Sequence, residues 1–327
     1  MNAQRPEWND ANNALVGSGL SMVTLYYMRR YVAFLQTLLR GGEAHFLLTA
    51  QVADWLQHTA RVLVDAQQAM QAGHWTPARA RALFEALGRG SSAYRQTIYA
   101  AGYLADPCEV SADEIQAMLA ASLVVLDQSI RENRREDGLY HAYNLLLSAD
   151  TALAIGHLYP MLEGQVAVLS SGVLSAAESA ELIDTLFRSD LYREDQRSFM
   201  LYPDSPLPSF LEKNRIPAPA VEALPCLKAM IVRGDTRLIL QDADGQYRFA
   251  ARFNNAKAMK PVLAEMAELD AASRAQIEAL YESVFEHKRF TGRSGTMFAY
   301  EGRGSIYWHM VSKLLLAVQE VYFAARA

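Results

Sequence analysis

Apolar residues recur along most of the chain at steps of three and four positions, the spacing of one buried face of an α-helix. This pattern predicts helices over 15–39, 43–71, 76–101, 111–130, 140–159, 175–188, 255–268, 271–287 and 305–325. Start signals support several of them, such as the proline after a cap at Thr76-Pro77 and the capping box Ser111-Ala-Asp-Glu114. Strands and helices do not alternate, so a doubly wound sheet is not expected.

Two regions depart from the helical pattern. The segment 189–219 contains five prolines and predicts a long ordered loop that crosses the surface. The segment 236–253 holds two short apolar runs on either side of Asp242-Ala-Asp-Gly245, which predicts a β-hairpin. The expected fold class is therefore all-α with one small β-hairpin, formed as a single helical domain over residues 1–327.

Charge and cysteine content narrow the class of partner. The formal net charge of −5 argues against nucleic acid and against an anionic membrane surface. Cys108 and Cys226 are too few for a disulfide scaffold. The first ten residues are polar and do not form a signal peptide, so a cytoplasmic location is expected.

The opening motif Pro-Glu-Trp-Asn-Asp-Ala-Asn-Asn over residues 6–13 has the chemistry of a sugar site. The indole of Trp8 can support the apolar face of a sugar ring, and Asn9 and Asn13 can bond its hydroxyls. Glu7 or Asp10 can transfer a proton. Each of these side chains also has a structural interpretation, since Asp10 precedes a predicted helix and could cap it.

Two further polar and aromatic clusters lie where predicted helices end or begin. One is Tyr192-Arg-Glu-Asp-Gln196, and the other runs from residue 290 to Tyr300-Glu-Gly-Arg-Gly-Ser-Ile-Tyr-Trp-His309. If helix ends converge around one rim, these loops form a pocket with the opening motif. The predicted substrate-binding residues are Glu7, Trp8, Asn9, Asn13, Gln165, Asp195, Arg293, Tyr300, Trp308 and His309.

Cleavage of a glycosidic bond needs a carboxylic acid, and an inverting hydrolase needs a second carboxylate about 6.5 to 9.5 Å away. Asp10 and Glu301 are the candidates for acid and base, with Glu7 and Asp195 as reserves. Ion pairing is the alternative role for Glu301 and Asp195, and packing is the alternative for His309. Residues with metal-ligand spacing are not found, so a metal or organic cofactor is not expected.

Glu7-Trp-Asn-Asp10 resembles the Asp-Trp-Asn-Asp signature of inverting disaccharide phosphorylases of the cellobiose phosphorylase type, with Glu7 replacing the leading Asp. That family has an (α/α)6 barrel, and the resemblance assigns the general acid to Asp10. The stretch 161–172 is also similar to a segment of that family. Nearly the whole chain resembles part of larger bacterial proteins that are several times longer and share the three motifs.

The resemblance implies an incomplete (α/α)6 toroid, because twelve helices form that ring and the pattern predicts nine. It also implies a carbohydrate-active enzyme, an inverting glycoside hydrolase or phosphorylase, that acts on an oligosaccharide or another glycoside. Inorganic phosphate would be the co-substrate of a phosphorylase, and a missing N-terminal part of the enzyme would be a partner. The alternative is a non-catalytic helical module that binds a carbohydrate or a protein.

Overall fold

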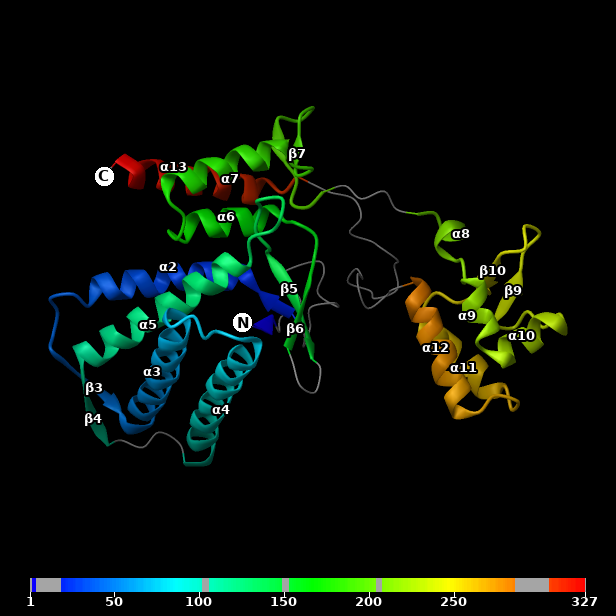
Figure 1. The fold of residues 1–327 in the computed structure, drawn as a ribbon, viewed down its shortest axis with the longest axis horizontal. Coiled ribbons are helices and arrows are strands. Elements are labelled where there is room, and N and C mark those ends of the chain that lie inside the picture. The colour runs from blue at the N-terminus through cyan, green and yellow to red at the C-terminus, as the bar shows by residue number, and fades with distance from the viewer. Residues whose placement is uncertain are drawn as a thin grey trace. The chain divides into compact units, whose positions relative to one another are not determined.

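A computed structural model of the chain describes residues 2–3, 19–101, 106–148, 153–203, 208–285 and 306–326. The chain divides into two compact units (Figure 1). Unit 1 comprises Met1–Asn2, Gly19–Pro203 and Ser305–Ala327, and unit 2 comprises Ala3–Ser18 and Asp204–Gly304. Unit 2 is thus inserted between two parts of unit 1. The expectation of one domain over residues 1–327 stays a prediction.

Unit 1 is a row of helices (Figure 1). Helix α13 packs against α7 and α6, α6 packs against α2, α2 against α5, α5 against α3, and α3 against α4. Its helices are α2 (Met22–Leu38), α3 (Ala50–Gln71), α4 (Pro77–Ala101), α5 (Ala112–Glu132), α6 (Leu162–Ser170), α7 (Ala176–Arg188) and α13 (Trp308–Arg326). Every residue from 164 to 169 is buried, so α6 forms the centre of this core.

Several small sheets accompany these helices. Strand β1 (Asn2–Ala3) spans the first boundary between the units. The other strands of unit 1 are β2 (Gly19–Ser21), β3 (His45–Thr49), β4 (Pro107–Ser111), β5 (Tyr143–Ser148), β6 (Leu153–His157), β7 (Tyr192–Arg193) and β8 (Ser198–Phe199). One sheet has the order β1-β2-β5-β6, and β3–β4 and β7–β8 form antiparallel pairs. The chain is mostly helical, as predicted, but it has more sheet than the single hairpin expected.

Three helix predictions were wrong over part or all of their described length. Residues 19–21 were expected to be helical within 15–39, but they form β2, which pairs with β5, and the helix begins only at Met22. Residues 140–159 were expected to be helical, yet β5 and β6 form an antiparallel pair there. Residues 43–49 were expected to begin a helix, but β3 pairs with β4 about 60 residues further along the chain. In all three places the backbone bonds to another strand instead of to its own helical turn, and local spacing alone does not reveal a distant partner.

The helix starts predicted from caps are confirmed. Ser111 accepts a bond from the backbone of Glu114, and the Glu114 carboxylate accepts one from the Ser111 backbone, so both halves of the capping box form. Ser175 and Glu178 do the same at the start of α7. Helix α4 runs over Pro77–Ala101, as the proline at its first position indicated.

Unit 2 contains the confirmed hairpin and a compact helical core. Its elements are α8 (Phe210–Lys213), α9 (Ala218–Glu222), α10 (Pro225–Val232), β9 (Ile239–Gln241), β10 (Tyr247–Phe249), α11 (Ala256–Glu265) and α12 (Ala271–Phe285). The buried rings of Phe249, Tyr281 and Phe285 meet in its core, with centroids of the last two 4.7 Å apart. The buried Asn214 amide accepts from the Phe249 N–H and donates to its carbonyl, which fixes β10 to the end of α8.

The proline-rich region is more structured than predicted. The segment 189–219 includes β7, β8, α8 and the first residues of α9. Ser209 begins α8 with a capping box to Glu212, and Pro217 caps α9. Pro217 and Pro219 lie at the start of α9, where a fixed φ and a missing N–H are tolerated.

Residues Tyr140 to Ala142 join three elements of unit 1. The Gln165 amide of α6 accepts from the Tyr140 N–H at 2.9 Å and donates to the Tyr140 carbonyl at 2.8 Å. The Tyr26 hydroxyl of α2 donates to the His141 carbonyl at 2.6 Å. The Ala142 carbonyl accepts from the Met22 N–H at the start of α2, 2.9 Å away. We call these three residues the junction segment.

Replacement of Gln165 tests this junction. Gln165 also donates to the Met161 carbonyl, so Gln165→Ala leaves one buried N–H and two buried carbonyls with a lost partner. Each such group costs about 1–3 kcal/mol, and we expect the free energy of unfolding to fall by about 4 kcal/mol. Urea denaturation followed by circular dichroism measures this. The exposed Gln68→Ala on α3 serves as the control and should change stability little.

Candidate functional site

The motif Tyr192–Gln196 forms a tight hairpin. Strands β7 and β8 pair through Tyr192 with Phe199 and Arg193 with Ser198, and the turn lies between them. The Arg193 guanidinium donates to both carboxylate oxygens of Asp195, at 2.8 and 2.9 Å. These charge-assisted bonds lower the pKa of Asp195. An ionised carboxylate suits ligand binding or a base, and does not suit the general acid.

The hairpin and the start of α13 meet at one groove. Trp308 is the first residue of α13, and it is 63% exposed at the edge of a cavity of about 480 Å³. Helix α7, the hairpin and α13 line this groove through Ile183, Leu186, Phe187, Arg197, Ser198, Phe199, Trp308, Val311, Ser312, Leu314, Leu315 and Val318. Of the predicted site residues that the structure describes, Trp308 lines this groove, and Tyr192 packs behind it against Phe187 and Phe199.

The remaining described candidates lie near this groove or inside the core. The exposed His309 follows Trp308, and its ring centroid is 5.8 Å from that of Tyr307. Gln165 is fully buried, and both hydrogens of its amide are donated to backbone carbonyls. Its geometry is structural, and its role in sugar binding stays a prediction.

Most of the predicted catalytic machinery lies outside the described residues. This applies to the acid and base candidates and to six of the substrate-binding candidates. They are Glu7, Trp8, Asn9, Asp10, Asn13, Arg293, Tyr300 and Glu301. Their assignments stay predictions.

Sequence reasoning did not select Glu163, although it quoted the segment that contains it. Glu163 lies in the first turn of α6, and its carboxylate accepts a 3.0 Å bond from the Tyr143 hydroxyl of β5. Burial raises the pKa of Glu163, while the Tyr143 bond and the charge of Lys313 act in the opposite direction. The carboxyl thus retains a proton to higher pH than an ordinary glutamate. The signal in the sequence was a lone acid within an otherwise apolar helix.

A stacked histidine pair lies beside the junction segment. The rings of His141 and His157 are 3.9 Å apart and nearly parallel. His157 bonds through Nδ1 to Asn144, whose amide donates to Asn133 at 2.7 Å. Burial, together with the positive charge that His157 can carry, lowers the pKa of His141 to about 4. Among the residues that the structure describes, no group bonds to the buried Nδ1 of His141.

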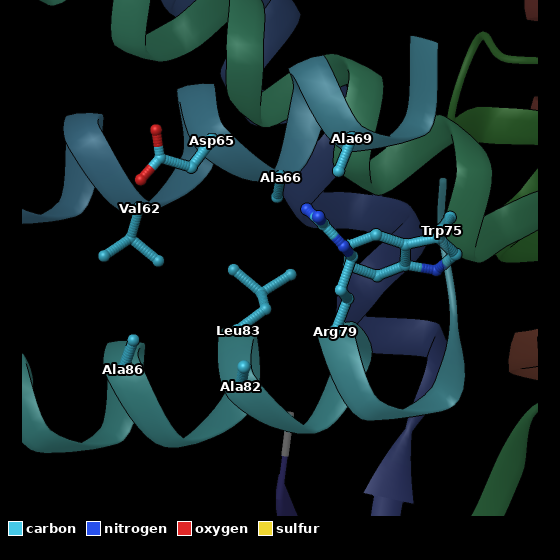
Figure 2. Close-up of a pocket in the computed structure, with 9 residues that line it drawn as sticks. All are labelled: Val62, Asp65, Ala66, Ala69, Trp75, Arg79, Ala82, Leu83 and Ala86. Atoms are coloured by element: carbon cyan, nitrogen blue, oxygen red, sulfur yellow. The ribbon is translucent and has the colours of Figure 1, made fainter. Parts of the chain in front are cut away.

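A second, smaller cavity lies between α3 and α4 (Figure 2). Its volume is about 200 Å³, and alanines such as Ala66 and Ala82 line it because their side chains do not fill the space between the helices. Arg79 of α4 extends toward α3 beside Trp75, whereas the Asp65 side chain of α3 points away from Arg79 (Figure 2). None of the predicted site residues lines this cavity.

Within the described ranges, His, Cys, Asp and Glu side chains do not gather in groups of three that could hold a metal ion. Of the helices described, none is long and apolar enough to span a bilayer.

The second compact unit, which interrupts the sequence of unit 1, matches a known family model. Residues 207–288 match the family model described as GH149 phosphorylase insertion domain 2. This range nearly coincides with the described part of unit 2, which is inserted into unit 1. The match supports a glycoside phosphorylase-like family. No curated protein matches the chain significantly.

The His141 environment predicts an acid-dependent loss of stability. Because its folded pKa lies below the ordinary value of 6.5, the neutral ring contributes stability fully above that pH and loses it as pH falls toward 4. Lowering the pKa of His141 from 6.5 to about 4 corresponds to about 3 kcal/mol of folding free energy.

We therefore expect the stability difference between wild type and His141→Gln to change by about 3 kcal/mol between pH 7 and pH 4. Urea titrations at each pH measure it, with the exposed His74→Gln as the control. A difference that is independent of pH would contradict the assignment.

The raised pKa of Glu163 predicts the opposite dependence of stability on pH. Since its folded pKa is raised, the protonated carboxyl contributes stability below the ordinary value of 4.5, and this contribution is lost as pH rises through the higher folded value. Glu163→Gln keeps an acceptor for Tyr143 but cannot ionise. Wild type should lose stability relative to Glu163→Gln as pH rises from 4 to 8, as measured by thermal unfolding. The exposed Glu265→Gln on α11 should show no such trend.

Proposed function

We propose that the chain acts as an inverting glycoside phosphorylase on an oligosaccharide or another glycoside. The observation that carries the proposal is the match of residues 207–288 to a phosphorylase insertion domain, in a unit that interrupts a row of helices. The row supports, as part of the same proposal, an (α/α)6-type arrangement for unit 1.

In the proposed reaction, an oxygen of inorganic phosphate attacks the anomeric carbon as the glycosidic C–O bond breaks. Asp10 donates its proton to the leaving oxygen, so the products are a sugar 1-phosphate of inverted configuration and a shortened glycoside. Phosphate is the nucleophile, and phosphorolysis needs no carboxylate base.

The binding roles follow the chemistry of the side chains. Trp8 and Trp308 offer indole faces to sugar rings, and Trp308 is exposed at the groove between the hairpin and α13. Asn9, Asn13 and His309 provide hydrogen bonds to hydroxyls. Arg293 is the candidate contact of the phosphate.

Two substitutions separate phosphorolysis from hydrolysis. In phosphorolysis, Asp10→Asn should lower turnover by about 10² or more, because the leaving oxygen loses its acid. Glu301→Gln should retain most of the turnover, since phosphate replaces the activated water. Release of sugar 1-phosphate from a panel of oligosaccharides, with and without inorganic phosphate, measures both.

The matched control is Asp244→Asn in the exposed turn of the β9–β10 hairpin. Turnover that does not require phosphate and that falls in Glu301→Gln would favour an inverting hydrolase. A chain without turnover on any glycoside, with or without phosphate, would contradict the proposal and favour the non-catalytic module.

A further inference from the structure

The groove between α7, the β7–β8 hairpin and α13 is mostly apolar along its length. Its walls include Leu186 and Phe187 of α7 and Val311 and Leu315 of α13. A sugar ring carries hydroxyls around its edge, and a hydroxyl that is buried without a hydrogen-bond partner is unfavourable. The body of the groove therefore suits a hydrocarbon group better than a further sugar ring.

The polar groups of the groove lie toward one end. Helix α13 begins at Trp308, and the hairpin that supplies Arg197 and Ser198 lies at this end of α13 (Figure 1). From Trp308 the groove follows α13 as far as Val318, a distance of roughly 15 Å at the rise of an α-helix. The Ser312 hydroxyl donates to the Trp308 carbonyl at 3.0 Å, so it is already used within the helix. The groove thus has a polar end and an apolar remainder.

Ser198 gives the polar end a hydrogen-bonding group that the described part of the chain does not use. Its side chain lines the groove and is only 4% exposed. Among the described residues, none bonds to its Oγ atom. Buried hydroxyls are nearly always hydrogen-bonded in folded proteins, because an unpaired one is destabilising. A ligand oxygen at this end of the groove would supply the missing partner.

Arg197 adds a second donor beside Ser198. Its φ of 46° lies in the left-handed region, which no other described residue except glycine adopts. Strained backbone of this kind is concentrated at ligand-binding and active sites. Arg193 is paired with Asp195, whereas the exposed Arg197 side chain has no such pair within the described ranges. Its guanidinium is therefore available to a ligand oxygen.

We propose that the groove holds the hydrocarbon chain of an alkyl glycoside, the class of substrate on which the chain acts. The sugar ring lies on the exposed indole of Trp308, its hydroxyls bond to Arg197 and Ser198, and the alkyl chain runs along α13. The cavity of about 480 Å³ has the size of an ordinary ligand site. This inference rests on the proposed function, in which phosphate replaces the alkoxy group at the anomeric carbon. The products are then a sugar 1-phosphate and the alcohol, whose oxygen takes the proton of the acid.

Isothermal titration calorimetry of the full chain with octyl glucoside and butyl glucoside, each below its micelle concentration, tests the inference. Each methylene that is buried should tighten binding about fourfold, so octyl glucoside should bind about 100-fold more tightly than butyl glucoside. Octanoate has a similar chain without the sugar and should bind more weakly than octyl glucoside. Equal affinities for the two glucosides would overturn the inference, as would octanoate that binds at least as tightly as octyl glucoside.

Two neighbouring leucines provide a variant and its control. Leu315 lines the groove and is 69% exposed, so Leu315→Glu should place a charge beside the alkyl chain and abolish the preference for octyl over butyl glucoside. Leu316 is 59% exposed and does not line the groove, so Leu316→Glu should keep the preference. Both variants should retain the wild-type circular dichroism spectrum. A preference that survives in Leu315→Glu would overturn the inference.

Ser198→Ala tests the polar end separately. Loss of one hydrogen bond should weaken the binding of octyl glucoside about fivefold. Because the hydroxyl has no partner within the described part of the protein, the substitution should not lower the free energy of unfolding. An unchanged affinity for octyl glucoside would contradict the role of Ser198.

Binding and turnover distinguish this inference from the proposed function. Phosphate-dependent release of sugar 1-phosphate from unsubstituted oligosaccharides, without a preference for octyl over butyl glucoside, would overturn the inference and retain the proposed function. A preference for octyl glucoside that is lost in Leu315→Glu, in a chain without turnover on any glycoside, would support the alkyl site and contradict phosphorolysis.

Discussion

Unit 1 depends on the close approach of α6 to the junction segment. A Cβ added to Gly164 would lie 3.1 Å from the backbone of Ala142, so α6 and the junction segment touch at a point where only glycine leaves room. This contact lets the Gln165 amide bond the Tyr140 peptide from the side, as a neighbouring strand would. Through the same three residues α2 and β5 are held to α6. The groove at α13 is in turn positioned by the packing of α13 on α6.

The helices with local start signals were predictable, and the strands were not. Ser111, Ser175 and Pro77 act on the turn that follows them, so their effect can be read without the rest of the fold. Strand β5 pairs with β2 more than 120 residues earlier, and nothing within 140–159 indicates that partner. At the candidate site, Trp308 was selected from its sequence cluster and lies at a groove, while the convergence of the three clusters stays a prediction. Glu163 was not selected, because its character arises from burial by distant elements.

The two units have different relations to the proposed chemistry. Unit 2 has its own core and its own amide–peptide tie at Asn214, and it carries the family match. In unit 1, Trp308 and His309 lie at the start of α13, and the hairpin that carries the Arg193–Asp195 pair lines the groove beside Trp308. An insertion can diverge without disturbing the helices around it, because both of its ends return to the same row. The family match of unit 2 is therefore compatible with a sugar site proposed in the helices of unit 1.

The return of α13 to the row affects the synthesis of this protein. On the ribosome, α2, α5 and α6 emerge early, but the last wall of the pocket that encloses α6 is made only after residues 204–304 have been translated. At typical elongation rates that delay is about 5–20 s. During it, Val166, Leu169 and their neighbours lack their α13 contacts. The apolar side chains of α6 that face α13 thus stay uncovered by that helix for the whole of this interval.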